Sequence, residues 1–203
     1  MRLFTALLPP AAAVAELTAA VAPLRRLPGA DDLRWTATGG WHLTLAFFGE
    51  VADELRPELD ERLARAAHRH EPLTLRLAGG GHFGRGTLWT GAEGDLAALA
   101  RLAASVRAAG RRAGVPDDPA GHAFRAHLTL ARAPRSSRVP LTPFTDALGT
   151  FSGSAWTAGT LSLVASSLPR SGEPGEQPRY DTVAAWPLGR TPGPGGGRAA
   201  ADG

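Results

Sequence analysis

Hydrophobic residues recur along the chain at two spacings, one typical of helices and one typical of strands. Three stretches place apolar residues three or four positions apart, which predicts three amphipathic helices. Their core-facing residues are Val14, Leu17, Val21 and Leu24; Leu55, Leu59 and Leu63; and Leu96, Leu99, Leu102 and Val106. We expect the first helix to stop before Pro28. The third should begin at an Asp95 N-cap and end between Gly110 and Gly114.

Shorter stretches alternate apolar and polar residues, which is the pattern of half-buried strands. They are RLFTALL (2–8), WHLTLAFFG (41–49), PLTLRLA (72–78), TLWTG (87–91), AHLTLAR (126–132), part of WTAGTLSLVASSL (156–168), and RYDTVAAWPL (179–188). The segments GGGHFGRG (79–86) and APRSSRVPLTP (133–143) are expected to be irregular. Strands and helices thus alternate, without the glycine motifs of a Rossmann fold or a P-loop.

The composition is that of an ordinary globular protein. The chain has 203 residues, 43% hydrophobic and 20% charged, which is enough for one full domain or two small lobes. It has no cysteine, so disulfides and thiolate-bound metals are excluded. The formal net charge is only +3, but all 22 basic residues are arginine. Arginine suits phosphate recognition, although a GC-rich genome explains this bias equally well.

The N-terminal stretch MRLFTALLPPAAAVAELTAA has the charge and the apolar run of a signal peptide, but Pro9 and Pro10 interrupt that run. A strand followed by a proline-initiated helix fits the same residues better. No stretch of the chain approaches the ~20 apolar residues of a membrane span. We therefore expect a cytoplasmic protein that does not associate with membranes.

The pentapeptide His-Leu-Thr-Leu-Ala occurs twice, beginning at His42 and at His127, which suggests an internal duplication. Because side chains alternate across a strand, the histidine of each copy shares a face with its threonine, Thr44 or Thr129. If the two polar faces meet across a cleft, one imidazole can deprotonate a nucleophile while the other protonates a leaving oxygen at phosphorus. The threonine hydroxyls can donate hydrogen bonds to the phosphoryl oxygens.

Other polar residues are weaker candidates. Arg132 lies five positions after the second histidine, so only a strand end or a bulge would bring it to the same face. His68 and His70 lie at a helix end, where we expect them to face solvent. His82 and His122 lie in loops from which they could touch a substrate. No His-x-x-x-His pair or carboxylate-flanked histidine cluster indicates a metal site.

These residues resemble a known family, the bacterial and archaeal RNA 2′,3′-cyclic phosphodiesterases, also called 2′-5′ RNA ligases, of the two-histidine phosphoesterase superfamily. The likeness spans roughly residues 2 to 188 and rests on RLFTALLPP, WHLTLAFFGEV, LWTG, FRAHLTLAR and SLVASSLPRSGEPGEQPRYDTVAAWPL. It implies a catalytic acid–base pair, His42 and His127, and a set of phosphate-binding residues, Thr44, Thr129 and Arg132. The family usually has proline before the second histidine, where this chain has Ala126.

The resemblance also implies an α+β fold with two lobes related by a pseudo-twofold duplication. Two antiparallel sheets would flank a central groove, with helices outside. Residues 1–190 would form this single domain, with half repeats of about 1–93 and 94–190, and residues 191–203 a disordered tail. The implied reaction is hydrolysis of an RNA-terminal 2′,3′-cyclic phosphate to a 2′-phosphomonoester, by a monomer that needs no metal or cofactor. Reversible 2′-5′ ligation of RNA ends is the same chemistry with a ribose hydroxyl in place of water.

Two other functions fit the same residues. The substrate could be a small cyclic phosphate, such as a nucleotide or an ADP-ribose derivative, or the chain could be a non-catalytic module that binds RNA ends. The presence of both His-x-Thr pairs favours catalysis, since binding alone needs no matched acid and base. Trp35, Trp41 and Phe83 could stack a base near the cleft, or could belong to the core.

Overall fold

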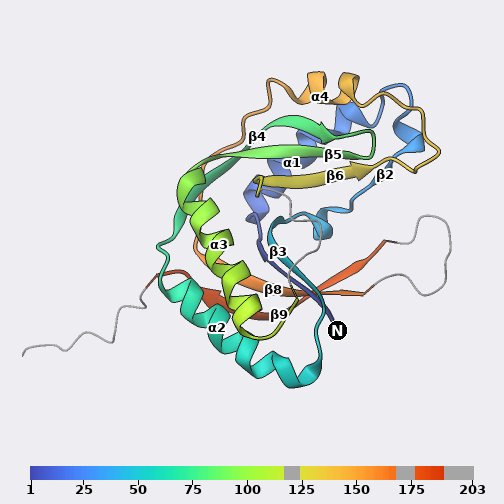
Figure 1. The fold of residues 1–203 in the computed structure, drawn as a ribbon. Coiled ribbons are helices and arrows are strands. Elements are labelled where there is room, and N and C mark those ends of the chain that lie inside the picture. The colour runs from blue at the N-terminus through green and yellow to red at the C-terminus, as the bar shows by residue number, and fades with distance from the viewer. Residues whose placement is uncertain (117–123, 168–176, 190–203) are drawn as a thin grey trace, which may run out of the picture.

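The structure is a computed structural model, and it describes residues 1–116, 124–167 and 177–189. It contains two antiparallel sheets with helices packed on their outer faces (Figure 1). This arrangement confirms the predicted α+β class. The loop position His122 and the C-terminal segment 191–203 lie outside the described residues. Within them, no helix is both long enough and apolar enough to cross a membrane.

The strands of the two sheets come from both ends of the chain. The first sheet consists, in spatial order, of β3 (Leu43–Glu50), β1 (Arg2–Leu7), β8 (Thr160–Ser167) and β9 (Arg179–Pro187). The second sheet consists of β2 (Arg34–Trp35), β6 (His127–Arg132), β5 (Thr87–Gly94), β4 (Leu73–Phe83) and β7 (Trp156–Ala158). Each copy of the repeated pentapeptide therefore lies in a different sheet.

The described residues form four α-helices, which are α1 (Ala11–Leu24), α2 (Arg56–His68), α3 (Leu96–Arg112) and α4 (Thr142–Leu148), and three short 3₁₀ turns at Ala30–Asp32, Thr38–Gly40 and Asp53–Leu55. A strand–helix–strand order occurs twice, as β5–α3–β6 and as β1–α1–β3, where the short β2 of the second sheet lies between α1 and β3. The helix of each unit packs on the opposite sheet: α1 contacts α4 and β4, whereas α3 contacts α2 and β3. This exchange of helices joins the two sheets through a shared core.

The predicted helical stripes form much of this core. Fully buried residues among them are Leu17, Val21, Leu24, Leu59, Leu63, Leu99, Leu102 and Val106. One prediction is wrong: Leu96, in the first turn of α3, is 41% exposed. Asp95 stands at the N-cap but makes no capping hydrogen bond. Its carboxylate instead accepts a hydrogen bond from the backbone N–H of Thr74 at 2.8 Å, which ties the helix start to β4.

The structure corrects the expected bounds of two segments. The glycine run at 79–81 is part of β4, which continues to Phe83, and the turn is confined to 84–86. The stretch 133–143 is irregular only up to residue 141, because Thr142 and Pro143 begin α4, whose Phe144 and Leu148 are fully buried. The first helix ends at Leu24, before Pro28 as expected.

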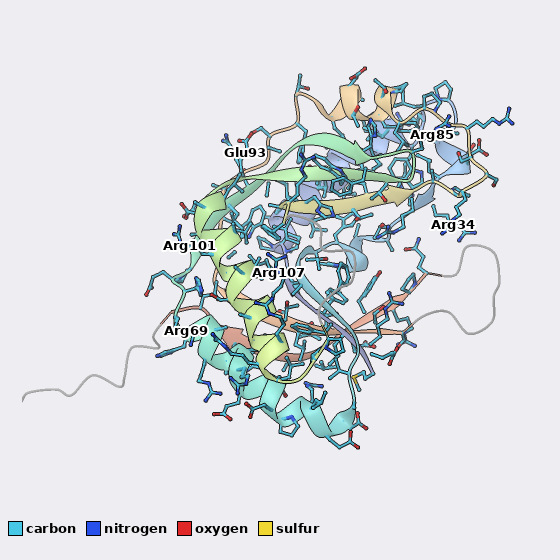
Figure 2. The ribbon with its side chains drawn as sticks, in the orientation of Figure 1. Arg34, Arg69, Arg85, Glu93, Arg101 and Arg107 are labelled. Atoms are coloured by element: carbon cyan, nitrogen blue, oxygen red, sulfur yellow. The ribbon has the colours of Figure 1, made fainter. Side chains whose placement is uncertain are left out.

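Most arginine side chains extend from the outer surface, as Figure 2 shows for Arg69 and Arg101. Arg2 and Arg132 are different, because they line a groove between the sheets. The arginine bias of the composition is therefore mainly a surface property, with two cations placed at the groove.

Candidate active site

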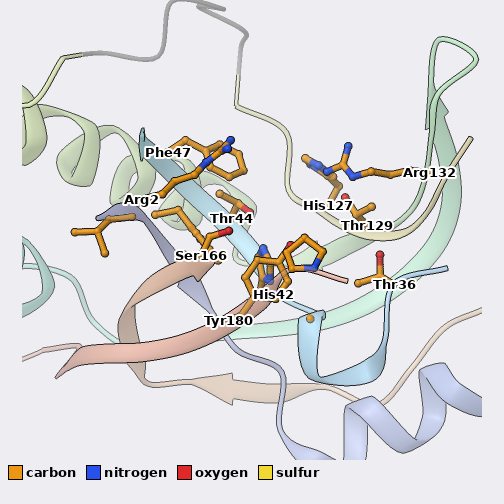
Figure 3. A pocket seen from close by; sticks show the side chains of 14 residues that line it. Arg2, Thr36, His42, Thr44, Phe47, His127, Thr129, Arg132, Ser166 and Tyr180 are labelled. Carbon is orange, nitrogen blue, oxygen red and sulfur yellow. The ribbon is translucent and has the colours of Figure 1, made fainter. Parts of the chain in front are cut away.

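The five residues selected from the sequence line one groove of about 400 Å³ (Figure 3). They are His42, Thr44, His127, Thr129 and Arg132. β3 and β6 approach each other at this groove. β6 begins with His127 and carries Thr129, whereas β3 carries Thr44 and His42 immediately precedes it. The expected alternation of faces is confirmed, because the leucines that follow each histidine and threonine are buried in the core. The two polar faces thus meet across the groove.

A β-bulge in each strand brings one further residue into the groove. In β6, Thr129 pairs with Trp89 and Ala131 with Leu88, so Leu130 has no partner position on β5. Leu130 and Ala131 are both buried, after which Arg132 returns to the face of the histidine. The bulge is the condition under which we expected Arg132 to reach the site.

The other histidine strand has the same irregularity. β3 skips Leu45 in its pairing with β1, and Leu45 and Ala46 are both buried. The next residue, Phe47, therefore points into the groove from the position equivalent to Arg132. The groove is thus nearly symmetric in its histidines and threonines, but has a phenyl ring on one side where the other has a guanidinium.

A backbone hydrogen bond two residues upstream orients each imidazole. His127 Nδ1 lies 2.8 Å from the carbonyl oxygen of Arg125. Because a carbonyl only accepts hydrogen bonds, Nδ1 carries the proton and Nε2 is left for the groove. His42 makes a hydrogen bond with the backbone of Gly40, at the same offset.

Aromatic side chains surround the His42 ring. Its centroid lies 4.6 Å from that of Phe4 and 5.3 Å from that of Tyr180. This burial lowers the pKa of His42 to about 4, although the Gly40 hydrogen bond opposes the change. The positive charges of His127 and Arg132 lower it further. His42 is therefore neutral at pH 7 in the free protein.

His127 has a lowered pKa for the same main reason, burial, with smaller contributions from Arg132 and Arg125. The hydrogen bond to the Arg125 carbonyl acts in the other direction. An anion bound between the two rings would favour their charged forms and raise both pKa values. A phosphate in the groove would therefore increase the number of protons that the pair holds.

The remaining sequence candidates lie elsewhere. His68 is exposed, but His70 is partly buried and hydrogen-bonded to Ser105 at 2.8 Å, so the expectation that it faces solvent is wrong. Its pKa is lowered, first by burial and then by nearby arginines. His82 Nδ1 lies 2.6 Å from the carbonyl oxygen of Gly84, and neither His82 nor the other two line the groove.

Two of the three aromatic candidates are structural. Trp41 is 4% exposed and lies in the core. Trp35 packs against the core and donates an Nε1 hydrogen bond to the carbonyl of Ala30 at 2.9 Å. Phe83 is 39% exposed and stands edge-on to His127, with ring centroids 4.8 Å apart.

Several groove residues were not identified from the sequence. They are Arg2, Thr36, Phe47, Ser166 and Tyr180, and they come from segments far apart in the chain. No motif marks them, because they meet only in the folded structure. The pairing of β1 with β3 and β8, and of β8 with β9, brings four of them together, and Thr36 is held against β6 by a hydrogen bond from its backbone N–H to the Leu130 carbonyl at 2.8 Å. Among the described residues, no three His, Cys, Asp or Glu side chains gather closely enough to hold a metal ion.

Two antiparallel sheets with paired His-x-Thr strands in the groove between them define the class of two-histidine phosphoesterase folds. The chain belongs to the 2′-5′ RNA ligase superfamily, whose family model matches residues 9–168. It is 32% identical over 160 residues to an RNA 2′,3′-cyclic phosphodiesterase of Geobacillus stearothermophilus, a match that covers 76% of this chain. The chain spans 47% to 64% of the length of the curated relatives it matches.

Solved structures agree with the family assignment. The protein TT0787 of Thermus thermophilus is 29% identical, with a TM-score of 0.70 over 94% of this chain and 99% of that protein. LigT of E. coli complexed with 3′-AMP is 28% identical, with a TM-score of 0.68 over 92% of this chain and 96% of that protein. The fold is thus similar over nearly the whole of these proteins.

Proposed function

We propose that this protein is a phosphoesterase that hydrolyses the terminal 2′,3′-cyclic phosphate of RNA to a 2′-phosphomonoester. The observation that carries the proposal is the meeting of two imidazoles and two threonine hydroxyls in one groove. The curated relatives, all named RNA 2′,3′-cyclic phosphodiesterase, support the same activity. A binding module for RNA ends would not require two matched proton-transfer groups.

In the proposed reaction the cyclic phosphate lies between the two histidines. The neutral imidazole takes a proton from water as the water oxygen bonds to phosphorus. The protonated imidazole donates its proton to the 3′ oxygen as the bond from phosphorus to that oxygen breaks. His42 and His127 exchange protonation states in this step, and proton exchange with solvent restores them.

The other groove residues would stabilise the charge on phosphorus-bound oxygens. Thr44 and Thr129, which line the groove, would donate hydrogen bonds to the nonbridging oxygens, whose negative charge grows in the transition state. Arg132 adds a permanent positive charge beside them. The Nδ1–H bond of His127 to the Arg125 carbonyl keeps its Nε2 directed at the reacting atoms.

The test is to incubate the purified protein with an RNA oligonucleotide that ends in a 2′,3′-cyclic phosphate and to identify the product by mass and by sensitivity to phosphatase. A gain of one water and a new 2′-phosphomonoester are expected. A second strand with a free 5′-hydroxyl, added to the same reaction, tests reversible 2′-5′ ligation, which the name of the matched family favours. Binding of the RNA without any change in mass would instead support a non-catalytic module.

A further inference from the structure

We propose that Phe83, Trp89 and Arg125 form a platform on which a nucleobase of the substrate stacks beside the phosphate site. This inference rests on the proposed function, because it takes the substrate to be an RNA end that carries a nucleobase next to its phosphate. None of the three residues lines the groove that holds the phosphate-binding side chains. All three surround His127, which does.

Strand register places both rings on the groove face of the second sheet. Trp89 pairs with Thr129, a groove residue, and paired residues of antiparallel strands share a face. Gly81 pairs with Trp89 in turn, and Phe83 lies two residues further along β4. The centroid of the Phe83 ring lies 5.4 Å from that of Trp89, and the two ring planes are inclined by 38°.

The absence of a side chain at Gly81 lets the indole of Trp89 pack against the backbone of β4. A Cβ atom at Gly81 would fall 2.3 Å from the Trp89 ring carbons, which is far inside van der Waals contact. At Gly91, two residues along β5 from Trp89, a Cβ atom would lie 3.0 Å from the carbonyl oxygen of Ala78 and 3.6 Å from the indole. The glycine-rich part of β4 thus serves to seat an aromatic ring, where its sequence suggested a turn.

The platform joins an exposed ring to a cation. Phe83 is 39% exposed, and the Arg125 guanidinium carbon lies 5.9 Å from its ring centroid and 5.6 Å from that of Trp89. Bases stack on aromatic rings and on guanidinium planes alike, without regard to base identity. An aromatic and cationic surface in contact with His127 matches a ligand that carries a base next to a phosphate.

Binding of product analogues tests the platform independently of catalysis. Calorimetry would compare adenosine 2′-monophosphate with ribose 2-phosphate, which lacks the base. We expect the wild type to bind the nucleotide at least about fivefold more tightly, as one base–ring stack would provide. In Phe83→Leu this preference should largely disappear, while the affinity for ribose 2-phosphate stays unchanged. Leu96→Ala, which removes an exposed apolar side chain from α3, serves as the matched control and should behave as the wild type does.

Three results would overturn the platform: equal affinity of the wild type for the two ligands, an equal loss of both affinities in Phe83→Leu, or a loss of base preference in Phe47→Leu instead. The second result would mean that the Phe83 ring only positions His127. Circular dichroism would verify that the variants fold. We expect both to fold, because the Phe83 and Phe47 rings are exposed and contribute little to the core. Failure of the proposed function is a separate outcome: cyclic-phosphate RNA would not be hydrolysed, yet the Phe83-dependent base preference would remain.

Discussion

Burial of His42 makes the stability of the folded protein depend on pH. The imidazole packs against Phe4 and Tyr180, and loss of hydration lowers its pKa from 6.5 to about 4. In the unfolded chain the pKa returns to its ordinary value. Between these two values the unfolded chain binds a proton that the folded protein does not. Stability therefore falls as the pH decreases from about 6.5 towards 4.

The size of this effect follows from the two pKa values. At about 1.36 kcal/mol per pH unit, the difference between 6.5 and about 4 corresponds to roughly 3 kcal/mol. Most of that loss should be present by pH 4.5. The lowered pKa of His127 acts in the same direction. Set against a total stability of about 5–15 kcal/mol for a typical domain, the change is easily measured.

The assay is urea denaturation of the wild type, His42→Asn and His68→Asn at pH 7.5 and pH 4.5. Carboxylates titrate in all three proteins and cancel in the comparison. Between the two pH values we expect the wild type and the exposed-site control His68→Asn to lose roughly 2–3 kcal/mol more than His42→Asn does. An equal loss in all three proteins would refute the assignment of a low pKa to His42.

Further predictions concern turnover and charge. His42→Ala and His127→Ala should each lower kcat by about 100-fold or more, as measured by product formation, and the double variant should be scarcely worse than the worse single one. Thr44→Val and Thr129→Val should each cost about 1.5–3 kcal/mol of transition-state stabilisation in kcat/KM, with unchanged circular dichroism, if the hydroxyl bonds a charged oxygen. Arg132→Gln should raise the pKa of both imidazoles, measured by NMR titration, since Arg132 lowers both in the wild type.

Sequence reasoning located the two histidine strands because an alternating pattern of period two fixes which side chains share a face. It left the place of Arg132 open, because a bulge depends on how the partner strand pairs. In β6 that pairing omits Leu130. The equivalent bulge in β3 brings Phe47 into the groove for the same reason. Local pattern therefore predicted which histidines and threonines share the groove face, and strand pairing decided their neighbours.

Glycine and leucine positions show the same limit. The run at 79–81 has the composition of a turn, but it lies inside β4. Gly81 is needed there because a side chain would collide with the ring of Trp89 on the neighbouring strand. Leu96 fits the helical period of α3 yet lies in its first turn, where its side chain stays exposed. Tyr180 reaches the groove from the far end of the chain.

The division of residues 1–190 into half repeats at about residue 93 stays a prediction, since each sheet combines strands from both halves.

The most direct test of the histidine pair is the pH dependence of kcat/KM for hydrolysis of cyclic-phosphate RNA in the presence of EDTA. The reactive form of the free protein carries one proton on the pair. As the pH increases, the population of this form grows when the pH passes the lower pKa and shrinks when the pH passes the higher pKa. Because burial lowers the pKa of both His42 and His127, we predict a bell-shaped profile with its maximum below pH 6.5 and its acidic limb near pH 4. EDTA should leave the rate unchanged. Activity that rises steadily into the alkaline range, or that EDTA abolishes and a divalent cation restores, would contradict the account.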